Sequence, residues 1–117
     1  MNPLETSEIG KTGLRVTRLG LGGAPFGDLP PEIARYQATE SIKKGLELGI
    51  GYFDTAPLYG SGKSEVYHSL ALADVNRSDY VISTKVGKLL VPSTSPDNLG
   101  DKYVNLPPLD VVFDYSR

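Results

Sequence analysis

Several features are missing from this sequence of 117 residues, and each absence excludes a class of protein. There is no cysteine, which excludes a disulfide framework and thiolate metal sites and fits a cytoplasmic protein; we name no metal-ligating residue. No apolar run approaches the roughly 18 residues that a membrane span needs. The opening MNPLETSEIG lacks the charged and apolar regions of a secretory signal. Lysine and arginine do not cluster and the net charge is −2, so we expect neither nucleic acid nor a membrane as partner.

The remaining composition is that of an ordinary globular protein, with 39% hydrophobic and 22% charged residues. A chain of 117 residues is long enough for one small domain with its own core. We assign residues 1–117 to a single partial domain. It would consist of a hairpin over 6–18, βα units over about 17–87 and an irregular loop over 88–108.

Four segments are typical of strands or their edges. The turn GKTG at 10–13 lies between apolar residues and indicates a short hairpin leading into a strand near 17–22. The segment IGYFDTA is typical of a buried strand ending at Asp54. DYVISTKVG at 79–87 predicts a third strand, rich in β-branched residues. LDVVFDY, near the end of the chain, predicts a further short strand or a loop edge.

Two helices are expected between these strands. In residues 32–48 four apolar side chains recur at helical spacing: Ala34, Ala38, Ile42 and Leu46. Gly45 lies beside that stripe, where a small residue permits close packing on a sheet, and Gly49 follows as a stop signal. In residues 63–73 the apolar positions expected to face the core are Val66, Leu70 and Ala73.

This alternation of strand, helix, strand, helix and strand predicts a parallel α/β sheet. Such a sheet needs cover on both faces or closure into a barrel, and two short helices cannot cover both faces. The chain stops at DYSR directly after an apolar segment, and residues 88–108 contain four prolines without periodicity. We therefore expect part of a larger fold, and expect the 117-residue chain alone to be poorly folded or self-associated and inactive.

The stretch FDTAPLYGSGKSE at 53–65 raises the question of a nucleotide-binding P-loop. The tail GKS and its position between a strand and a helix match that motif, G-x-x-x-x-G-K-[ST]. Its first glycine, however, should stand where Pro57 is, and proline offers neither the flexibility nor the N–H that a phosphate-wrapping turn needs. We therefore interpret the glycines at 60 and 62 as a turn into the helix.

The same region offers groups for proton chemistry. Working residues of parallel α/β folds collect at the carboxyl ends of strands. Asp54 ends the second strand, Lys85 the third, and Tyr59 lies in the loop after Asp54, so we expect all three on one rim, with Gly22-Gly23 from the first strand. A nearby ammonium lowers the pKa of a tyrosine, and a carboxylate holds that ammonium in place. The set predicts proton donation to a carbonyl oxygen, although each residue type also occurs in turns and strand ends without function.

Three segments carry a family resemblance: RLGLGGAPFG, GIGYFDTAPLYGSGKSE and DYVISTKVG. In order and wording they resemble the N-terminal part of the aldo-keto reductases, over roughly residues 7–117. GLGGAPFG and VFDYS are most similar to the sugar- and pyridoxal-oxidising dehydrogenases of that family. The resemblance implies the first third of a (β/α)8 TIM barrel, opened by a hairpin and incomplete in this chain.

The resemblance also implies an oxidoreductase that uses NADP or NAD to interconvert a carbonyl and an alcohol in a small molecule such as a sugar or aldehyde. Tyr59 matches the acid–base residue, Lys85 tunes it, and Asp54 holds Lys85 and lies near the cofactor ribose. Gly22 and Gly23 match the loop whose backbone touches the cofactor. Substrate identity, the choice between NAD and NADP, and the oligomeric state stay open.

The family's fourth catalytic residue is a histidine after the next strand, beyond this chain, as are the segments that bind pyrophosphate and adenosine. The only histidine here, His68, lies two residues from Val66 and from Leu70, about 200° around a helix. We therefore expect it to point into solvent and exclude it as a substitute.

Three other functions stay open in principle. The chain could be a non-enzymatic remnant or interaction module, which the absent histidine favours. It could be a Schiff-base lyase on a similar barrel with Lys85 as nucleophile. A P-loop nucleotide binder fits the sequence less well, because Pro57 stands where that motif needs glycine.

Overall fold

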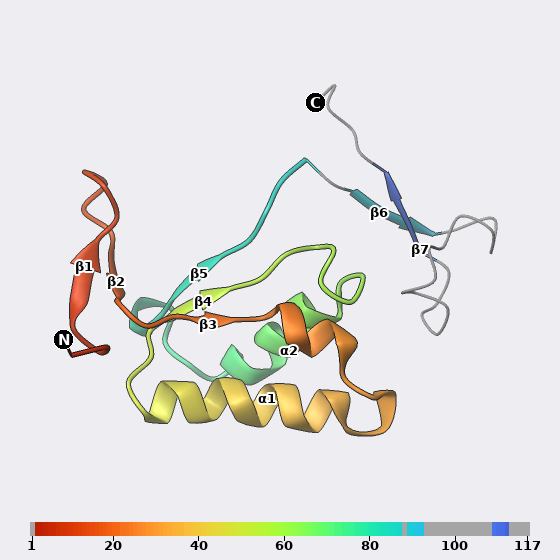
Figure 1. The fold of residues 1–117 in the computed structure, drawn as a ribbon, viewed down its shortest axis with the longest axis horizontal. Coiled ribbons are helices and arrows are strands. Elements are labelled where there is room, and N and C mark those ends of the chain that lie inside the picture. Colours follow the sequence, from red (N-terminus) through yellow and green to blue (C-terminus); the bar gives the residue numbers. More distant parts are fainter. Residues whose placement is uncertain (1, 88, 93–108, 113–117) are drawn as a thin grey trace.

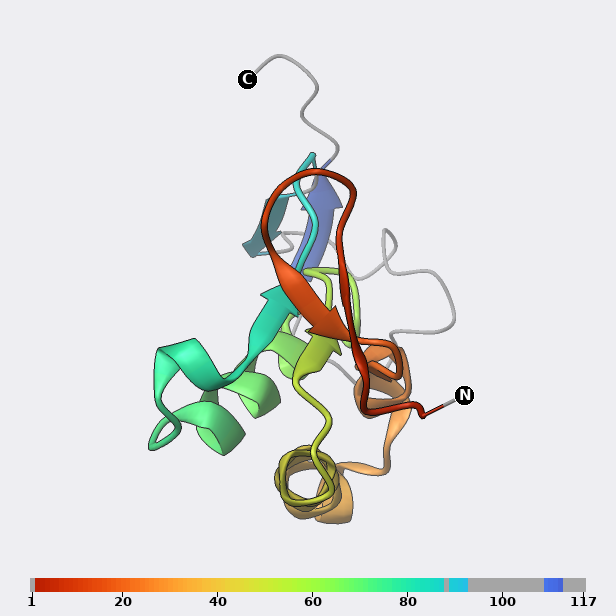
Figure 2. The ribbon, with the colours of Figure 1, turned by 90° about the vertical axis from the view of Figure 1, so that its left-hand side faces the viewer.

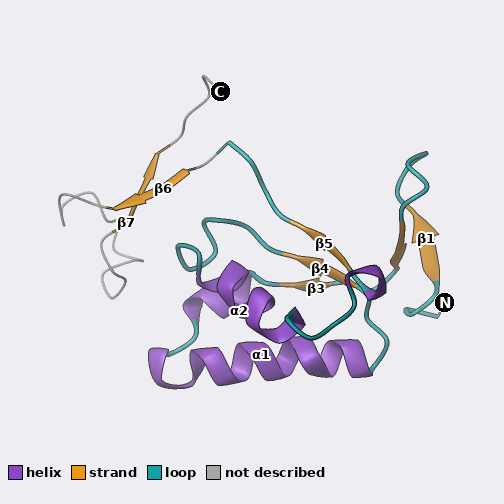
Figure 3. Cartoon of the chain, turned by 180° about the vertical axis from the view of Figure 1, so that it is seen from behind, coloured by secondary structure: helices purple, strands orange, loops and turns teal. Residues whose placement is uncertain are grey.

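A three-stranded parallel sheet lies at the centre of the structure, a computed structural model that describes residues 2–87, 89–92 and 109–112. The strands lie side by side in the order β3 (Leu21–Gly22), β4 (Tyr52–Asp54) and β5 (Val81–Ser83). Helices α1 (Pro31–Glu47) and α2 (Lys63–Leu72) both pack on one face of this sheet (Figures 1 and 3). The predicted alternation of strands and helices and the parallel sheet are confirmed.

Smaller elements flank the sheet. A hairpin of β1 (Thr6–Glu8) and β2 (Arg15–Thr17) lies at the amino end of the sheet strands, as Figure 2 shows from that side. Two 3-10 turns, Ala24–Asp28 and Arg77–Asp79, precede α1 and β5.

A second, antiparallel pair joins β6 (Leu89–Pro92) to β7 (Leu109–Val112). Residues 89–92 were predicted to be irregular and instead form β6, because a strand needs a partner that a local pattern does not reveal. The rest of the predicted irregular loop, 88 and 93–108, lies outside the described residues.

Helix α1 buries the stripe that its sequence predicts. Ala34, Ala38 and Ile42 are at most 1% exposed, and Leu46 packs at the edge of the same core. The helix ends at Glu47, and Gly49, two residues later, has a left-handed φ of 92°. The N–H of Gly49 bonds the carbonyl of Leu46, and that of Ile50 bonds the carbonyl of Gly45, a Schellman ending.

The prediction of which face of α2 is buried was wrong. Val66 and Leu70 are 55% and 41% exposed, whereas Ser64 and His68 are buried, together with Ala71 and Leu72. The expectation that His68 points into solvent is also wrong, since its side chain is only 1% exposed. Apolar spacing misplaced the buried face because two of its residues, Ser64 and His68, are polar and each hydrogen-bonds a carbonyl oxygen inside the protein.

The two faces of the sheet differ in chemistry. Phe53 and Ile82 point to the helices and join a core with Phe26, Ala38, Ile42 and Leu72. Their neighbours along the strands, Tyr52, Asp54 and Ser83, point to the opposite face because side chains alternate along a strand. The sheet therefore carries an apolar face under the helices and a polar face away from them. Among the described residues, no helix is long and apolar enough to cross a membrane.

Candidate active site

Asp54 and Lys85 form an ion pair at the carboxyl end of the sheet. Asp54 ends β4, and Lys85 follows two residues after β5, the neighbouring strand. The Nζ of Lys85 lies 3.1 Å from Oδ2 of Asp54 and donates a further hydrogen bond of 2.9 Å to the carbonyl oxygen of Thr55. Side-chain exposures of 51% for Lys85 and 39% for Asp54 make the pair accessible, so its value lies in orientation more than in stability.

Tyr59 lies against this pair. The Nζ of Lys85 is 4.8 Å from the centroid of the Tyr59 ring, within the range of a cation–π contact. The three residues singled out from the sequence therefore lie together at one rim.

The ionisation states of the pair follow from these contacts. The hydroxyl of Ser83 donates a 2.6 Å hydrogen bond to Oδ1 of Asp54. This bond, together with the bond and charge of Lys85, lowers the pKa of Asp54 in spite of partial burial. Burial tends to lower the pKa of Lys85, but its interactions with Asp54 and Tyr59 outweigh burial and raise the pKa. Near neutral pH the site thus holds a carboxylate and an ammonium.

The loop that carries Tyr59 is held by an unusually close contact between two glycines. A Cβ on Gly27 would lie 2.3 Å from the backbone nitrogen of Gly60, and a Cβ on Gly60 would lie 2.4 Å from the Cα of Gly27. Neither position can carry a side chain without moving backbone. The 3-10 turn that precedes α1 therefore sets the position of the loop between Asp54 and α2.

The glycine-rich turn does not present a phosphate cradle. Three consecutive residues, Gly60, Ser61 and Gly62, have φ values of 64°, 50° and 93°. The N–H groups of Ser61, Lys63 and Ser64 bond carbonyl oxygens of residues 58–60 in the same loop. These donors are engaged within the chain, which supports the interpretation of the glycines as a turn.

Gly22 is the last residue of β3 and Gly23 follows it, and the two have different reasons to be glycine. A Cβ on Gly23 would lie 2.5 Å from Oγ of Ser64 and 2.6 Å from Cε1 of His68, so close packing on α2 explains it. Its N–H bonds Asp54 and its carbonyl accepts from Ser64, so both backbone groups are engaged. A Cβ on Gly22 would meet nothing within 4 Å, and Gly22 lies opposite Asp54 in the sheet. Internal packing among the described residues therefore does not explain Gly22.

His68 lies on the other side of the sheet from the ion pair. Its Nδ1 donates a 2.7 Å hydrogen bond to the carbonyl of Ser64, and its ring lies between Phe26 and Phe53. Burial lowers its pKa, although the Ser64 bond opposes this, so the ring is neutral at pH 7. Nε2 is buried without a hydrogen-bond partner among the described residues. His68 is therefore a core residue, and burial rather than exposure separates it from the acid–base set.

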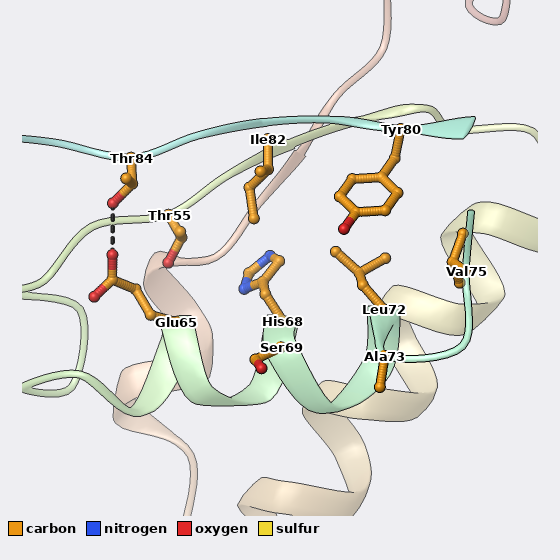
Figure 4. Close-up of a pocket in the computed structure, with 10 residues that line it drawn as sticks. All are labelled: Thr55, Glu65, His68, Ser69, Leu72, Ala73, Val75, Tyr80, Ile82 and Thr84. Atoms are coloured by element: carbon orange, nitrogen blue, oxygen red, sulfur yellow. Dashed lines mark hydrogen bonds between the residues drawn. The ribbon is translucent and has the colours of Figure 1, made fainter. Parts of the chain in front are cut away.

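A pocket of about 390 Å³ opens between α2 and β5 (Figure 4). His68 and Leu72 point from α2 toward Ile82 and Tyr80, and Glu65 accepts a 2.7 Å hydrogen bond from Thr84 at one end. The pocket lies on the helix side of the sheet and is not lined by Asp54, Tyr59 or Lys85. It is therefore separate from the rim.

The sequence interpretation missed several residues that build the site: Ser83, Tyr52, Gly27 and Ser64. The hydroxyl of Ser64 bonds Thr55 at 2.8 Å and the carbonyl of Gly23 at 2.9 Å, which ties α2 to the ends of β3 and β4. Ser83 has a sequence signal, since it lies two residues before Lys85, which is the spacing of side chains on one side of an extended chain. Gly27 has none, because its partner Gly60 is distant in sequence.

Comparison with known proteins gives consistent matches. Residues 18–105 match the Aldo/keto reductase family. The chain is 40% identical over 124 aligned positions to pyridoxal 4-dehydrogenase of Microbacterium luteolum, covering 96% of this chain and 35% of that protein. It is 37% identical over 90 positions to L-galactose dehydrogenase of Arabidopsis thaliana, covering 75% of this chain and 28% of that protein. The chain thus spans about a third of the length of these relatives.

Solved structures of related proteins also superimpose on this chain. The glycerol dehydrogenase of Gluconobacter oxydans superimposes with a TM-score of 0.60 at 27% identity, covering 95% of this chain and 31% of that one. An aldo-keto reductase from Bacillus halodurans, in its holo form, gives a TM-score of 0.59 at 36% identity, covering 72% and 26%. The fold is therefore part of a (β/α)8 barrel, which the described residues do not close.

Proposed function

The chain belongs to the Aldo/keto reductase family, and on that premise we propose that it provides the acid–base rim of an oxidoreductase that interconverts carbonyl and alcohol groups. The observation that carries the proposal is the contact of Lys85 with both Asp54, at 3.1 Å, and the ring of Tyr59, at 4.8 Å. A tyrosine, a lysine and a carboxylate at the carboxyl end of parallel strands form a set suited to proton transfer at a carbonyl oxygen.

In this proposal Tyr59 is the acid in reduction and the base in oxidation. Its hydroxyl gives a proton to the carbonyl oxygen as an alcohol forms. The ammonium of Lys85 stabilises the negative charge left on the phenol, and Asp54 keeps Lys85 charged and directed toward the ring. The bond from Lys85 to the Thr55 carbonyl restricts the ammonium further.

The open space at Gly22, beside Asp54 on the polar face, fits the presence of a cofactor. Gly22, Gly23 and Asp54 would hold part of a nicotinamide dinucleotide, NAD or NADP. When bound, this group supplies or accepts the hydride. Because both backbone groups of Gly23 are already bonded within the chain, we propose Gly22 as the closer contact.

The names of the relatives suggest a substrate class. Pyridoxal and a sugar appear in the names of two of them, and both molecules present an aldehyde or a hemiacetal carbon. We propose a small polar aldehyde, or the corresponding alcohol or lactol, as substrate.

The geometry does not favour the Schiff-base alternative. A nucleophilic lysine needs a lowered pKa so that its amine is free, whereas the pKa of Lys85 is raised by Asp54 and Tyr59. The interaction-module alternative differs in predicting no cofactor binding.

The test uses the 117-residue chain and a hybrid in which it replaces the matching 35% of the Microbacterium luteolum dehydrogenase. Each is titrated with NAD and NADP by nicotinamide fluorescence and assayed at 340 nm with pyridoxal, L-galactose and glycerol. The proposal expects dinucleotide binding and turnover in the hybrid, both reduced by Asp54→Asn. A folded hybrid that binds neither dinucleotide would leave the non-enzymatic function as the better description.

A further inference from the structure

Two side chains outside the acid–base set connect to it through an unbroken line of hydrogen bonds. The hydroxyl of Tyr52 lies 3.1 Å from Oγ of Ser83, and Oγ of Ser83 lies 2.6 Å from Oδ1 of Asp54. We propose that Tyr52 and Ser83 are positioning residues, which fix the carboxylate of Asp54 so that its other oxygen faces Lys85. This role rests on the proposed function.

The direction of the line follows from proton counting. A serine hydroxyl has a single proton, and an ionised carboxylate can only accept. Ser83 must therefore donate to Asp54, and its 2.6 Å length is that of a charge-assisted O–H···O⁻ bond. With that proton committed, the hydroxyl of Tyr52 donates to Ser83.

The pairing of β4 with β5 holds the side chains of this line next to one another. Asp54 and Ser83 are directly paired in the register of β4 and β5, and Tyr52 lies two residues before Asp54 on the same face. Tyr52 is held from the other side as well, because a Cβ on Gly20 would lie 2.8 Å from Cδ1 of its ring. The ring thus packs directly on the backbone of Gly20.

The two oxygens of the Asp54 carboxylate have different sets of hydrogen-bond donors. Oδ1 accepts the bond from Ser83 and a longer bond of 3.4 Å from Nζ of Lys85, whereas Oδ2 accepts only the shorter bond of 3.1 Å from Lys85. Without Ser83 the carboxylate is free to turn about its terminal torsion, which is soft. Lys85 then keeps only the Thr55 carbonyl as a fixed partner, and its position over the ring of Tyr59 is less well defined.

The kinetic test compares three variants, each made in the hybrid with the Microbacterium luteolum dehydrogenase: Ser83→Ala, Ser83→Thr and Tyr52→Phe. We expect Ser83→Ala to lower kcat about tenfold or more, since bonds to charged groups are the stronger ones, with KM for the carbonyl substrate unchanged. The acid limb of the pH–rate profile should move to higher pH, because Ser83 is the main cause of the lowered pKa of Asp54. Ser83→Thr retains the hydroxyl and should restore both quantities, and Tyr52→Phe should shift the limb less.

A double variant tests whether Tyr52 and Ser83 act through one connected line of hydrogen bonds or through two independent contacts. If Tyr52 acts only through Ser83, the variant Tyr52→Phe with Ser83→Ala behaves as Ser83→Ala alone. Ser78→Ala is the matched control, because Ser78 also bonds a carboxylate, that of Asp79 at 3.2 Å, on the exposed surface. Additive effects in the double variant, or an equal shift in the control, overturn the proposal.

A measurement that does not need activity keeps this test separate from the proposed function. The pKa of Asp54 is read from its carboxyl ¹³C signal by NMR titration, with Asp54→Asn identifying the signal. We expect a higher pKa in Ser83→Ala and the original value in Ser83→Thr. Should no variant reduce a carbonyl while this shift is present, the proposed function fails and the positioning of Asp54 stands. An unchanged pKa in Ser83→Ala overturns the positioning role itself.

Discussion

Replacing Gly27 by alanine should displace the loop of Tyr59 without touching the acid–base residues. The added Cβ would lie 2.3 Å from the nitrogen of Gly60, 2.7 Å from its Cα and 2.8 Å from the carbonyl carbon of Tyr59. All three are backbone atoms, so no side chain can rotate away. Restoring an ordinary contact requires one loop to retreat by roughly 1 Å.

Two effects of known size follow. Overpacking of this kind costs about 1–3 kcal/mol. In the longer hybrid chain of the proposed test, that corresponds to a melting temperature lower by a few degrees. A shift of about 1 Å in a reacting group also lowers kcat by up to about 100-fold.

The assay uses the hybrid with the Microbacterium luteolum dehydrogenase and pairs thermal unfolding by circular dichroism with kcat for carbonyl reduction. Gly22→Ala is the steric control, since a Cβ there meets nothing within 4 Å. It should leave the melting temperature unchanged and weaken only dinucleotide binding. A Gly27→Ala protein with the original melting temperature and kcat would refute the reasoning that this glycine contact holds the loop.

The remaining predictions concern the titratable residues. Tyr59→Phe should abolish most carbonyl reduction while dinucleotide affinity by fluorescence titration is retained, because only the phenolic proton is lost; near-normal turnover would contradict the assignment. Lys85→Met should lower kcat comparably and move the pH dependence of the residual activity upward, since phenolate costs more to form without the ammonium; an unchanged profile would argue against this role. His68→Leu should flatten the pH dependence of the melting temperature below about pH 6.5. The folded-state pKa of His68 is lowered, so its contribution to stability is present above the unfolded value and is lost as pH falls; equal slopes in both proteins would count against this account.

The sequence predicts one helix well and the other poorly, for a physical reason. The buried stripe of α1 is entirely apolar, so its spacing is sufficient to orient the helix. The buried face of α2 includes Ser64 and His68, which bond the carbonyls of Gly23 and Ser64, and hydropathy does not report such bonds. Spacing alone therefore assigned the wrong face.

The same distinction applies to the rim. The positions of Asp54 and Lys85 follow from a general rule, since both come at the ends of neighbouring parallel strands. The bond from Ser83 to Asp54 depends on the exact pairing of two strands separated by 29 positions in sequence. Pairing register is a property of the assembled sheet, and no local pattern contains it.

The contrast between the two faces of β4 links the chemistry of the rim to the fidelity of folding. Shifting a strand by one residue exchanges its faces. Such a slip would place the charge of Asp54 beneath the helices and expose the ring of Phe53, which is now fully buried. Both changes cost free energy, so a sheet with the wrong register is much less stable than the correct one. A population that has folded correctly is therefore also one in which every molecule carries Asp54 on the side of Lys85.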